Sequence, residues 1–177
     1  MQKKKFEKKF NDICKKNMNE LNLPHYQFKI KQEGSVSSIF DSIRKKYVAL
    51  TPEEWVRQNF IQYLITEKKY PESLIGVEVS LKLNTLSKRS DIVLFNRNGL
   101  PLMIIECKST DVSIDQKVFD QVVRYNMIFQ APYIIVTNGL LHFCCKIDYH
   151  EQKSFFLKEI PEFSQISDSS CSNDMEA

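Results

Sequence analysis

Two strand-like segments, residues 91–96 and 102–108, constrain this chain more than any other feature, because an Asn98-Gly99 pair lies between them. Asn-Gly between apolar runs is the strongest short-range signal of a β-hairpin. With these two residues at the turn, opposed residues have numbers that sum to 197, so Asp91 faces Glu106. The sequence therefore predicts an antiparallel hairpin that carries two acids on one rung.

Two directly opposed carboxylates repel each other, because their Cβ atoms lie only roughly 4.5–5.5 Å apart. A divalent cation such as Mg²⁺ or Mn²⁺ between Asp91 and Glu106 would remove this repulsion. Side-chain alternation places Lys108 beside Glu106 and turns Cys107 into the core, from where its backbone carbonyl can still face the ion. Arg89 opposes Lys108 in the same register. Acids that hold an ion, next to a lysine that positions or deprotonates a water, suit phosphodiester hydrolysis.

The Glu-x-Lys pattern is weak evidence by itself. It occurs four times, at Glu7/Lys9, Glu67/Lys69, Glu106/Lys108 and Glu151/Lys153. Only the copy at Glu106 ends an apolar run and has an acid at the opposed hairpin position. The geometry alone fits a metal site and an exposed edge hairpin with a local ion pair equally well, and such an ion pair contributes little to stability.

The pattern between residues 51 and 150 predicts an α/β core in the order αβββαββ. Thr51 followed by Glu54, and Ser113 followed by Gln116, are capping boxes that each begin a helix. Alternating or short continuous apolar runs indicate strands. Outside the hairpin, these runs are residues 75–81, 133–136 and 141–147.

The regions on either side of this core differ from it in composition. Residues 1–50 are expected to form a basic amino-terminal helix followed by an extended lead-in. Residues 161–177 are rich in Ser, Asp, Glu and Asn and offer little to bury, which predicts a disordered polar tail. With 177 residues, the chain has the size of one ordinary domain.

Composition excludes several classes of protein. A net charge of +3 is too small to prove a nucleic-acid partner, and the seven lysines among the first sixteen residues are typical of a solvated helix face. Five cysteines without a C-x-x-C pair indicate neither a disulfide framework nor a zinc site. There is no phosphate-binding G-x-x-x-x-G-K-[ST] loop for ATP, and no apolar stretch approaches the ~20 residues of a membrane span. We expect a cytoplasmic protein without membrane contact.

Four further side chains are candidates for the site. Gln121 and Tyr125 lie four residues apart and can lean over the same patch of sheet, although a core tyrosine beside a polar neighbour is the simpler interpretation. Glu54 and Glu78 are candidate extra metal ligands. Each also has an ordinary explanation, as a capping-box residue and as a solvent-facing strand residue respectively.

Together these motifs resemble the amino-terminal nuclease domain of the R subunits of type I restriction enzymes, a member of the PD-(D/E)XK superfamily. The resemblance spans roughly residues 25 to 150, and the order and spacing of its motifs match. The matching segments are Thr51-Pro52-Glu53-Glu54-Trp55-Val56-Arg57-Gln58, Ser90-Asp91-Ile92-Val93, Ile105-Glu106-Cys107-Lys108, Gln121-x-x-x-Tyr125 and Thr137-Asn138-Gly139.

The resemblance implies a restriction-endonuclease-like fold, with a mixed sheet flanked by helices, that cuts DNA with Mg²⁺. By analogy Asp91 and Glu106 bind the metal and Lys108 is catalytic, while Gln121 and Tyr125 support cleavage or DNA binding. R subunits continue into an ATP-driven translocase, whereas this chain ends about where the nuclease module would. A stand-alone nuclease without a motor is expected, which leaves partnership with methylation and specificity subunits in doubt.

Other functions remain open at this point. A nucleic-acid or protein binding module that keeps the fold and uses the acids structurally belongs to a different class, and fold alone does not decide between the two. RNA is an alternative substrate. A symmetric homodimer would suit double-strand cleavage, but the sequence shows no interface.

Overall fold

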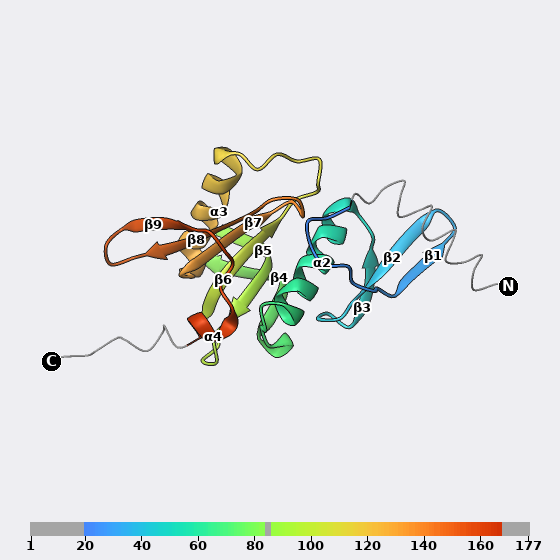
Figure 1. Cartoon of the computed structure of the whole chain (residues 1–177), viewed down its shortest axis with the longest axis horizontal. Helices are drawn as coiled ribbons and strands as arrows, with labels where there is room; N and C mark the ends of the chain where they lie inside the picture. The colour runs from blue at the N-terminus through green and yellow to red at the C-terminus, as the bar shows by residue number, and fades with distance from the viewer. Residues whose placement is uncertain (1–19, 84–85, 168–177) are drawn as a thin grey trace.

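The computed structural model describes residues 20–83 and 86–167, together with their side chains except those of residues 81–88 and 125 (Figure 1). The expected amino-terminal helix lies outside these ranges. The described chain forms two sheets, with helix α2 (Pro52–Thr66) between them in sequence. The smaller is an antiparallel sheet in the expected lead-in, with strands β1 (Ile30–Glu33), β2 (Val36–Asp41) and β3 (Lys46–Ala49).

The larger sheet has six strands in the spatial order β4-β5-β6-β7-β8-β9. It is mixed, because β6 and β7 run parallel while every other neighbouring pair is antiparallel. The mixed sheet with helices that the sequence implied is confirmed. The strands are β4 (Ile75–Leu83), β5 (Leu86–Phe95), β6 (Pro101–Cys107), β7 (Tyr133–Thr137), β8 (His142–Asp148) and β9 (Lys153–Leu157).

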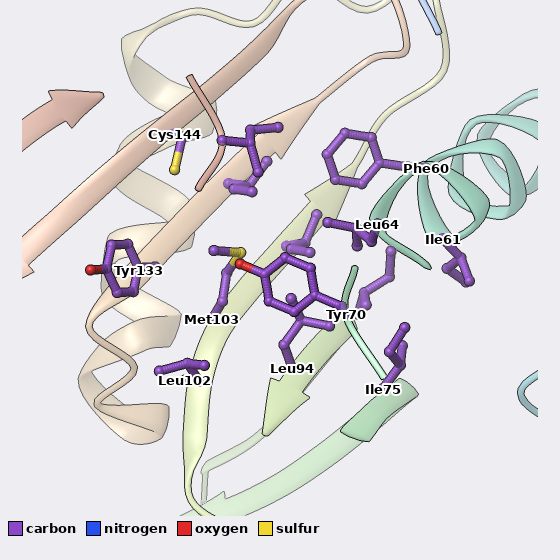
Figure 2. Close-up of a cluster of buried hydrophobic side chains, with 14 of the residues drawn as sticks. Phe60, Ile61, Leu64, Tyr70, Ile75, Leu94, Leu102, Met103, Tyr133 and Cys144 are labelled. Carbon is purple, nitrogen blue, oxygen red and sulfur yellow. The ribbon is translucent and has the colours of Figure 1, made fainter. Parts of the chain in front are cut away.

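Helices α2 (Pro52–Thr66) and α3 (Gln116–Phe129) cover opposite faces of the six-stranded sheet (Figure 1). Alternation along the strands divides the core accordingly, so that Ile105 packs with the α2 side and Ile104 with the α3 side. Figure 2 shows the α2 side, where Phe60 and Leu64 lie over the sheet. A short 3₁₀ helix, η1 (Glu72–Leu74), leads into β4.

The hairpin of β5 and β6 has the expected register but not the expected turn. The predicted sum of 197 holds where Ile92 pairs with Ile105 and Val93 with Ile104. Nearer the turn, however, Phe95 pairs with Pro101, and residues 97–99 form a three-residue loop closed by Asn96. A bulge then restores the sum of 197. The loop shifts the pairing by one residue and the bulge shifts it back. The side chains beyond the bulge therefore remain on the expected faces.

One of the two predicted helix starts differs from the sequence-based expectation. Helix α2 begins as predicted, since the Thr51 hydroxyl accepts the Glu54 N–H at 3.1 Å. Helix α3 is capped instead by Asp115, whose carboxylate accepts the Val118 N–H at 3.0 Å, and not by Ser113. Both residues are good N-caps, so their local patterns compete.

The predicted disordered tail is wrong for residues 161–167. Helix α4 (Phe163–Ile166) forms there, and its Phe163 and Ile166 are buried in the core on the α2 side. The Phe163 N–H donates to the Lys68 carbonyl at 3.0 Å, and the Phe163 ring packs against Tyr70. Two apolar side chains in a polar segment were enough to anchor it.

No helix in the described part of the chain is long and apolar enough to cross a membrane.

Candidate functional site

Asp91, Glu106 and Lys108 lie together at one end of the β5–β6 hairpin, where the sequence placed them. Asp91 comes directly before Ile92 and Glu106 directly after Ile105, and Ile92 and Ile105 are paired across the hairpin. The Asp91 Oδ2 atom accepts the backbone N–H of Cys107 at 2.8 Å, which ties this carboxylate to the end of β6. Lys108 Nζ donates to Glu106 Oε1 at 2.7 Å. The sheet therefore brings two acids and a lysine to one small region.

Strand β7 holds the lysine in place from the other side. The Lys108 N–H donates to the Thr137 carbonyl at 2.8 Å and continues the parallel pairing of Cys107 with Thr137. Cys107 itself is fully buried on the α2 side, as expected for a strand residue between two site residues. Residues 106–108 are therefore held by backbone pairing with β7 on one side and by the Asp91 carboxylate, which accepts the Cys107 N–H, on the other.

Arg57 is the main component of the site that sequence reasoning missed. From α2, its Nη2 atom donates to Asp91 Oδ1 at 2.8 Å and to Glu53 Oε1 at 3.3 Å. Its Nη1 atom donates to Glu54. Burial lowers the pKa of Arg57, but the charges of Asp91 and Glu54 more than offset this, and the pKa lies above its ordinary value. The apolar pattern of the helix predicts buried hydrophobic residues, so it gave no reason to expect a buried arginine.

Glu53 is a third acid of the site. Burial raises its pKa, and the negative charge of Asp91 raises it further, while Arg57 and Lys108 act in the opposite direction. These couplings place the Glu53 carboxylate within the field of both Asp91 and Lys108. A signal was available, since Glu53 precedes Arg57 by one helical turn.

Glu54 and Glu78, the two candidate extra ligands, accept hydrogen bonds from arginines. Glu54 accepts from Arg44 Nη2 at 3.0 Å and from Gln58 Nε2 at 2.8 Å, besides Arg57. Glu78 accepts from Arg44 Nη1 at 2.6 Å. Glu54 therefore links α2 to Arg44, and its part in the cap of α2 is limited to its backbone N–H.

The residues predicted to support the site are Arg89, Gln121 and Tyr125, on β5 and α3. Arg89 pairs with Ser80 on β4, its side chain is 63% exposed, and it reaches Glu78 at 3.8 Å. Gln121 is half-buried on α3, the helix that covers the sheet face shared by Val93 and Ile104. Helix α3 thus lies across the sheet from α2, whereas Asp91 is contacted from α2 by Arg57. The Tyr125 side chain is outside the described set.

The acids of the site carry charge that the protein compensates only in part. Burial raises the pKa of Glu106, and the nearby charge of Asp91 raises it further, although Lys108 partly opposes both effects. Burial lowers the pKa of Lys108, but its bond to Glu106 and the charges of Glu53 and Asp91 raise it above the ordinary value. Lys108 is therefore a cation at neutral pH, and Glu106 is strained in its ionised form.

Replacement of Glu106 by Gln is expected to stabilise the fold at neutral pH by a few degrees of unfolding temperature. A carboxyl whose pKa is raised by folding favours the folded state below its unfolded pKa and loses that contribution as the pH rises through its folded pKa. The gain of Glu106→Gln should therefore be present at pH 7 and vanish below about pH 4. Thermal unfolding across this range measures it, with Glu151→Gln on an exposed ion pair as the control. A variant less stable at pH 7 than the parent would contradict the assignment.

The oxygen donors of the site fit a hard divalent cation in chemistry. Carboxylates are the ligands that Mg²⁺ prefers, and Asp91, Glu106 and Glu53 share one electrostatic environment. Among residues 20–83 and 86–167, however, no group of three or more His, Cys, Asp or Glu side chains is arranged to hold a metal ion. The cations that contact these acids are Arg57 and Lys108.

Fold and site together define a mixed α/β protein with an acid-rich centre at one end of its sheet. The family model described as type I restriction enzyme R protein N terminus matches residues 52–161. The chain belongs to this family. The match begins at the first residue of α2 and ends after β9, so it contains Glu53, Arg57 and the whole β5–β6 hairpin.

One similar solved structure is a fragment assigned to the HsdR subunit of a type I restriction enzyme from Vibrio vulnificus YJ016. The identity is 18% and the TM-score is 0.45, over 63% of this chain. The chain spans only about a quarter of that fragment, with 24% of it covered. Among curated proteins, none is similar enough to be matched.

Proposed function

We propose that this chain is a metal-dependent nuclease of the PD-(D/E)XK class that hydrolyses phosphodiester bonds in DNA as part of a restriction-related system. The observation that carries the proposal is the convergence of Asp91, Glu106 and Lys108 at one end of a central hairpin. Membership of the R-protein family supports the restriction-related role. The order of helix, three strands, helix and two strands from α2 to β8 supports the class.

Asp91 and Glu106 are the residues that would hold Mg²⁺, with Glu53 and the Cys107 carbonyl as further oxygen donors. A bound Mg²⁺ supplies Lewis acidity toward a phosphate oxygen and lowers the pKa of a water. Lys108, held as a cation by Glu106, orients the attacking water or stabilises negative charge that develops on the phosphate. Burial of the site beside β7 limits the freedom of these groups before substrate binds.

Cleavage of supercoiled plasmid tests the function. With Mg²⁺ or Mn²⁺, we expect nicked and linear products that EDTA abolishes. The isosteric change Asp91→Asn should lower the rate by at least about 10–100-fold, the loss typical even for outer-shell partners of a metal. Asp148→Asn, at the last residue of β8, is the matched control and should retain the parent rate, because the Asp148 carboxylate accepts N–H groups of the following turn. Equal rates for parent and Asp91→Asn would rule out the assigned site.

A second candidate is a nucleic-acid binding module without catalysis. It is favoured by one observation, that both Asp91 oxygens are already engaged by Arg57 and the Cys107 N–H. Calorimetry with Mg²⁺ and a salt titration of DNA binding separate the two candidates. Salt-sensitive binding to DNA without any metal binding would support the module. RNA of the same sequence serves as the comparison substrate in both assays.

A further inference from the structure

Arg57 joins helix α2 to Asp91 of the candidate site through an ion pair of 2.8 Å. Its side chain is only 6% exposed, and its two terminal nitrogens contact the carboxylates of Glu53, Glu54 and Asp91. The Nε atom is buried without a hydrogen-bond partner. Both Nη atoms of the guanidinium thus contact carboxylates, whereas its Nε atom is buried without a hydrogen bond.

Arg44 offers an internal comparison. It lies just after β2, is 14% exposed, and contacts Asp41 at 2.5 Å, Glu54 at 3.0 Å and Glu78 at 2.6 Å. Both arginines therefore share Glu54 and are held in buried ion pairs, but only Arg57 reaches Asp91. The Arg44 cluster joins the small sheet to α2, whereas Arg57 joins α2 to the β5–β6 hairpin.

We infer that Arg57 is a built-in cation that occupies the Asp91 side of the metal site and competes with a divalent ion for Asp91 Oδ1. This inference rests on the proposed function, because it concerns the same site. Arg57 is a positioning residue: it orients Asp91 and also sets how tightly the site takes a metal. The guanidinium must give up its bond to Asp91, or share that oxygen, when a metal binds.

Electrostatics determines the sign of the effect. A fixed positive charge next to a divalent ion repels it, and the repulsion is strong where solvent is largely excluded. Removal of that charge should strengthen metal binding by at least about tenfold. The same change removes the group that orients Asp91, so cleavage should become slower. Tighter metal binding combined with slower turnover is a signature that general loosening of the fold would not produce.

The experiment is calorimetric titration of the full chain with Mn²⁺ and with Mg²⁺, for the parent, Arg57→Gln and Arg44→Gln. We expect tighter metal binding in Arg57→Gln. Arg44→Gln is the matched control, because it also removes one arginine from Glu54 but leaves Asp91 and Arg57 in contact, and its affinity should stay within about twofold of the parent. Plasmid cleavage at saturating metal then measures turnover for each variant.

Each outcome separates the inference from the proposed function. Metal binding by the parent and tighter binding by Arg57→Gln support both. Binding by Arg57→Gln alone supports the inference and overturns metal-dependent catalysis by the native chain. Equal or weaker binding in Arg57→Gln overturns the inference and leaves the function standing. Absence of binding in both overturns both.

A measurement on the parent chain covers the case in which Arg57→Gln does not fold. The guanidinium ¹H–¹⁵N signals of buried arginines can be followed during titration with diamagnetic Mg²⁺. The signal of Arg57 should shift as its bond to Asp91 is released, while that of Arg44 should stay in place. An unchanged Arg57 signal at metal saturation overturns the inference.

A further variant, Arg57→Lys, keeps the positive charge but not the two Nη donors of the guanidinium. Its metal affinity should lie between those of the parent and Arg57→Gln.

Discussion

Replacement of Lys108 by Ala is expected to lower the rate of DNA cleavage by about 10²–10³-fold, the loss typical when one preorganised charge-stabilising group is removed. Lys108 is half-buried and bonded to Glu106, and its raised pKa keeps it a cation throughout the neutral range. Single-turnover cleavage of plasmid at saturating Mg²⁺ is the measurement. Lys108→Arg should recover part of the lost rate, since the expected role is positive charge.

The chain provides its own control for this prediction. Lys153 ends another Glu-x-Lys segment, and its ammonium group contacts Glu151 at 3.2 Å, with both side chains more than half exposed. Lys153→Ala should therefore leave the cleavage rate unchanged, because an exposed ion pair on β9 contributes little. Equal losses in Lys108→Ala and Lys153→Ala would mean that the Glu-x-Lys pattern, rather than the position at the hairpin end, had been overinterpreted.

Replacement of Glu54 by Ala is expected to destabilise the protein by about 3–5 kcal/mol, the loss typical when one member of a buried ionic cluster is removed. Glu54 is 7% exposed in its side chain and is shared by Arg44 and Arg57, so its removal leaves two buried guanidinium groups undercompensated. Urea unfolding measures the change, which corresponds to roughly 10 °C or more in unfolding temperature.

Glu72→Ala is the matched control for Glu54. Glu72 makes an exposed ion pair with Lys45 at 2.9 Å, and its removal should cost less than about 1 kcal/mol. The same pair of variants tests whether Glu54 is a metal ligand or a structural anion. A stable Glu54→Ala protein with weakened metal binding would contradict the structural role that its three hydrogen-bond partners indicate.

The hairpin could be predicted from the sequence because its determinants are local. A period-two pattern and an Asn-Gly pair define which residues oppose each other, and a slip of one residue would have turned every side chain to the wrong face. The actual loop has three residues instead of two, which shifts the pairing by one residue, and the bulge shifts it back, so the predicted register still holds beyond the bulge. The capped start of α2 was also predicted correctly for a local reason, since its cap lies within four residues.

The choice among the acids of α2 could not be made from sequence. Glu53 and Glu54 are adjacent on a helix, so they point about 100° apart, and either could face the hairpin until the rotation of the helix is known. Helix α2 also buries polar side chains on several sides, among them Glu54, Arg57, Gln58 and Asn59, which blurs the stripe that would reveal its orientation.

The sequence by itself thus determined the hairpin that carries Asp91, Glu106 and Lys108, because strand alternation and turn chemistry act over a few residues. Only the tertiary structure decided that Arg57 and Glu53 join them, and that Glu54 and Glu78 share Arg44. Arg57 and Asp91 are separated by 34 positions in the chain, and their contact follows from how α2 packs on the sheet. No local pattern records that packing, since it depends on the shape of the whole core.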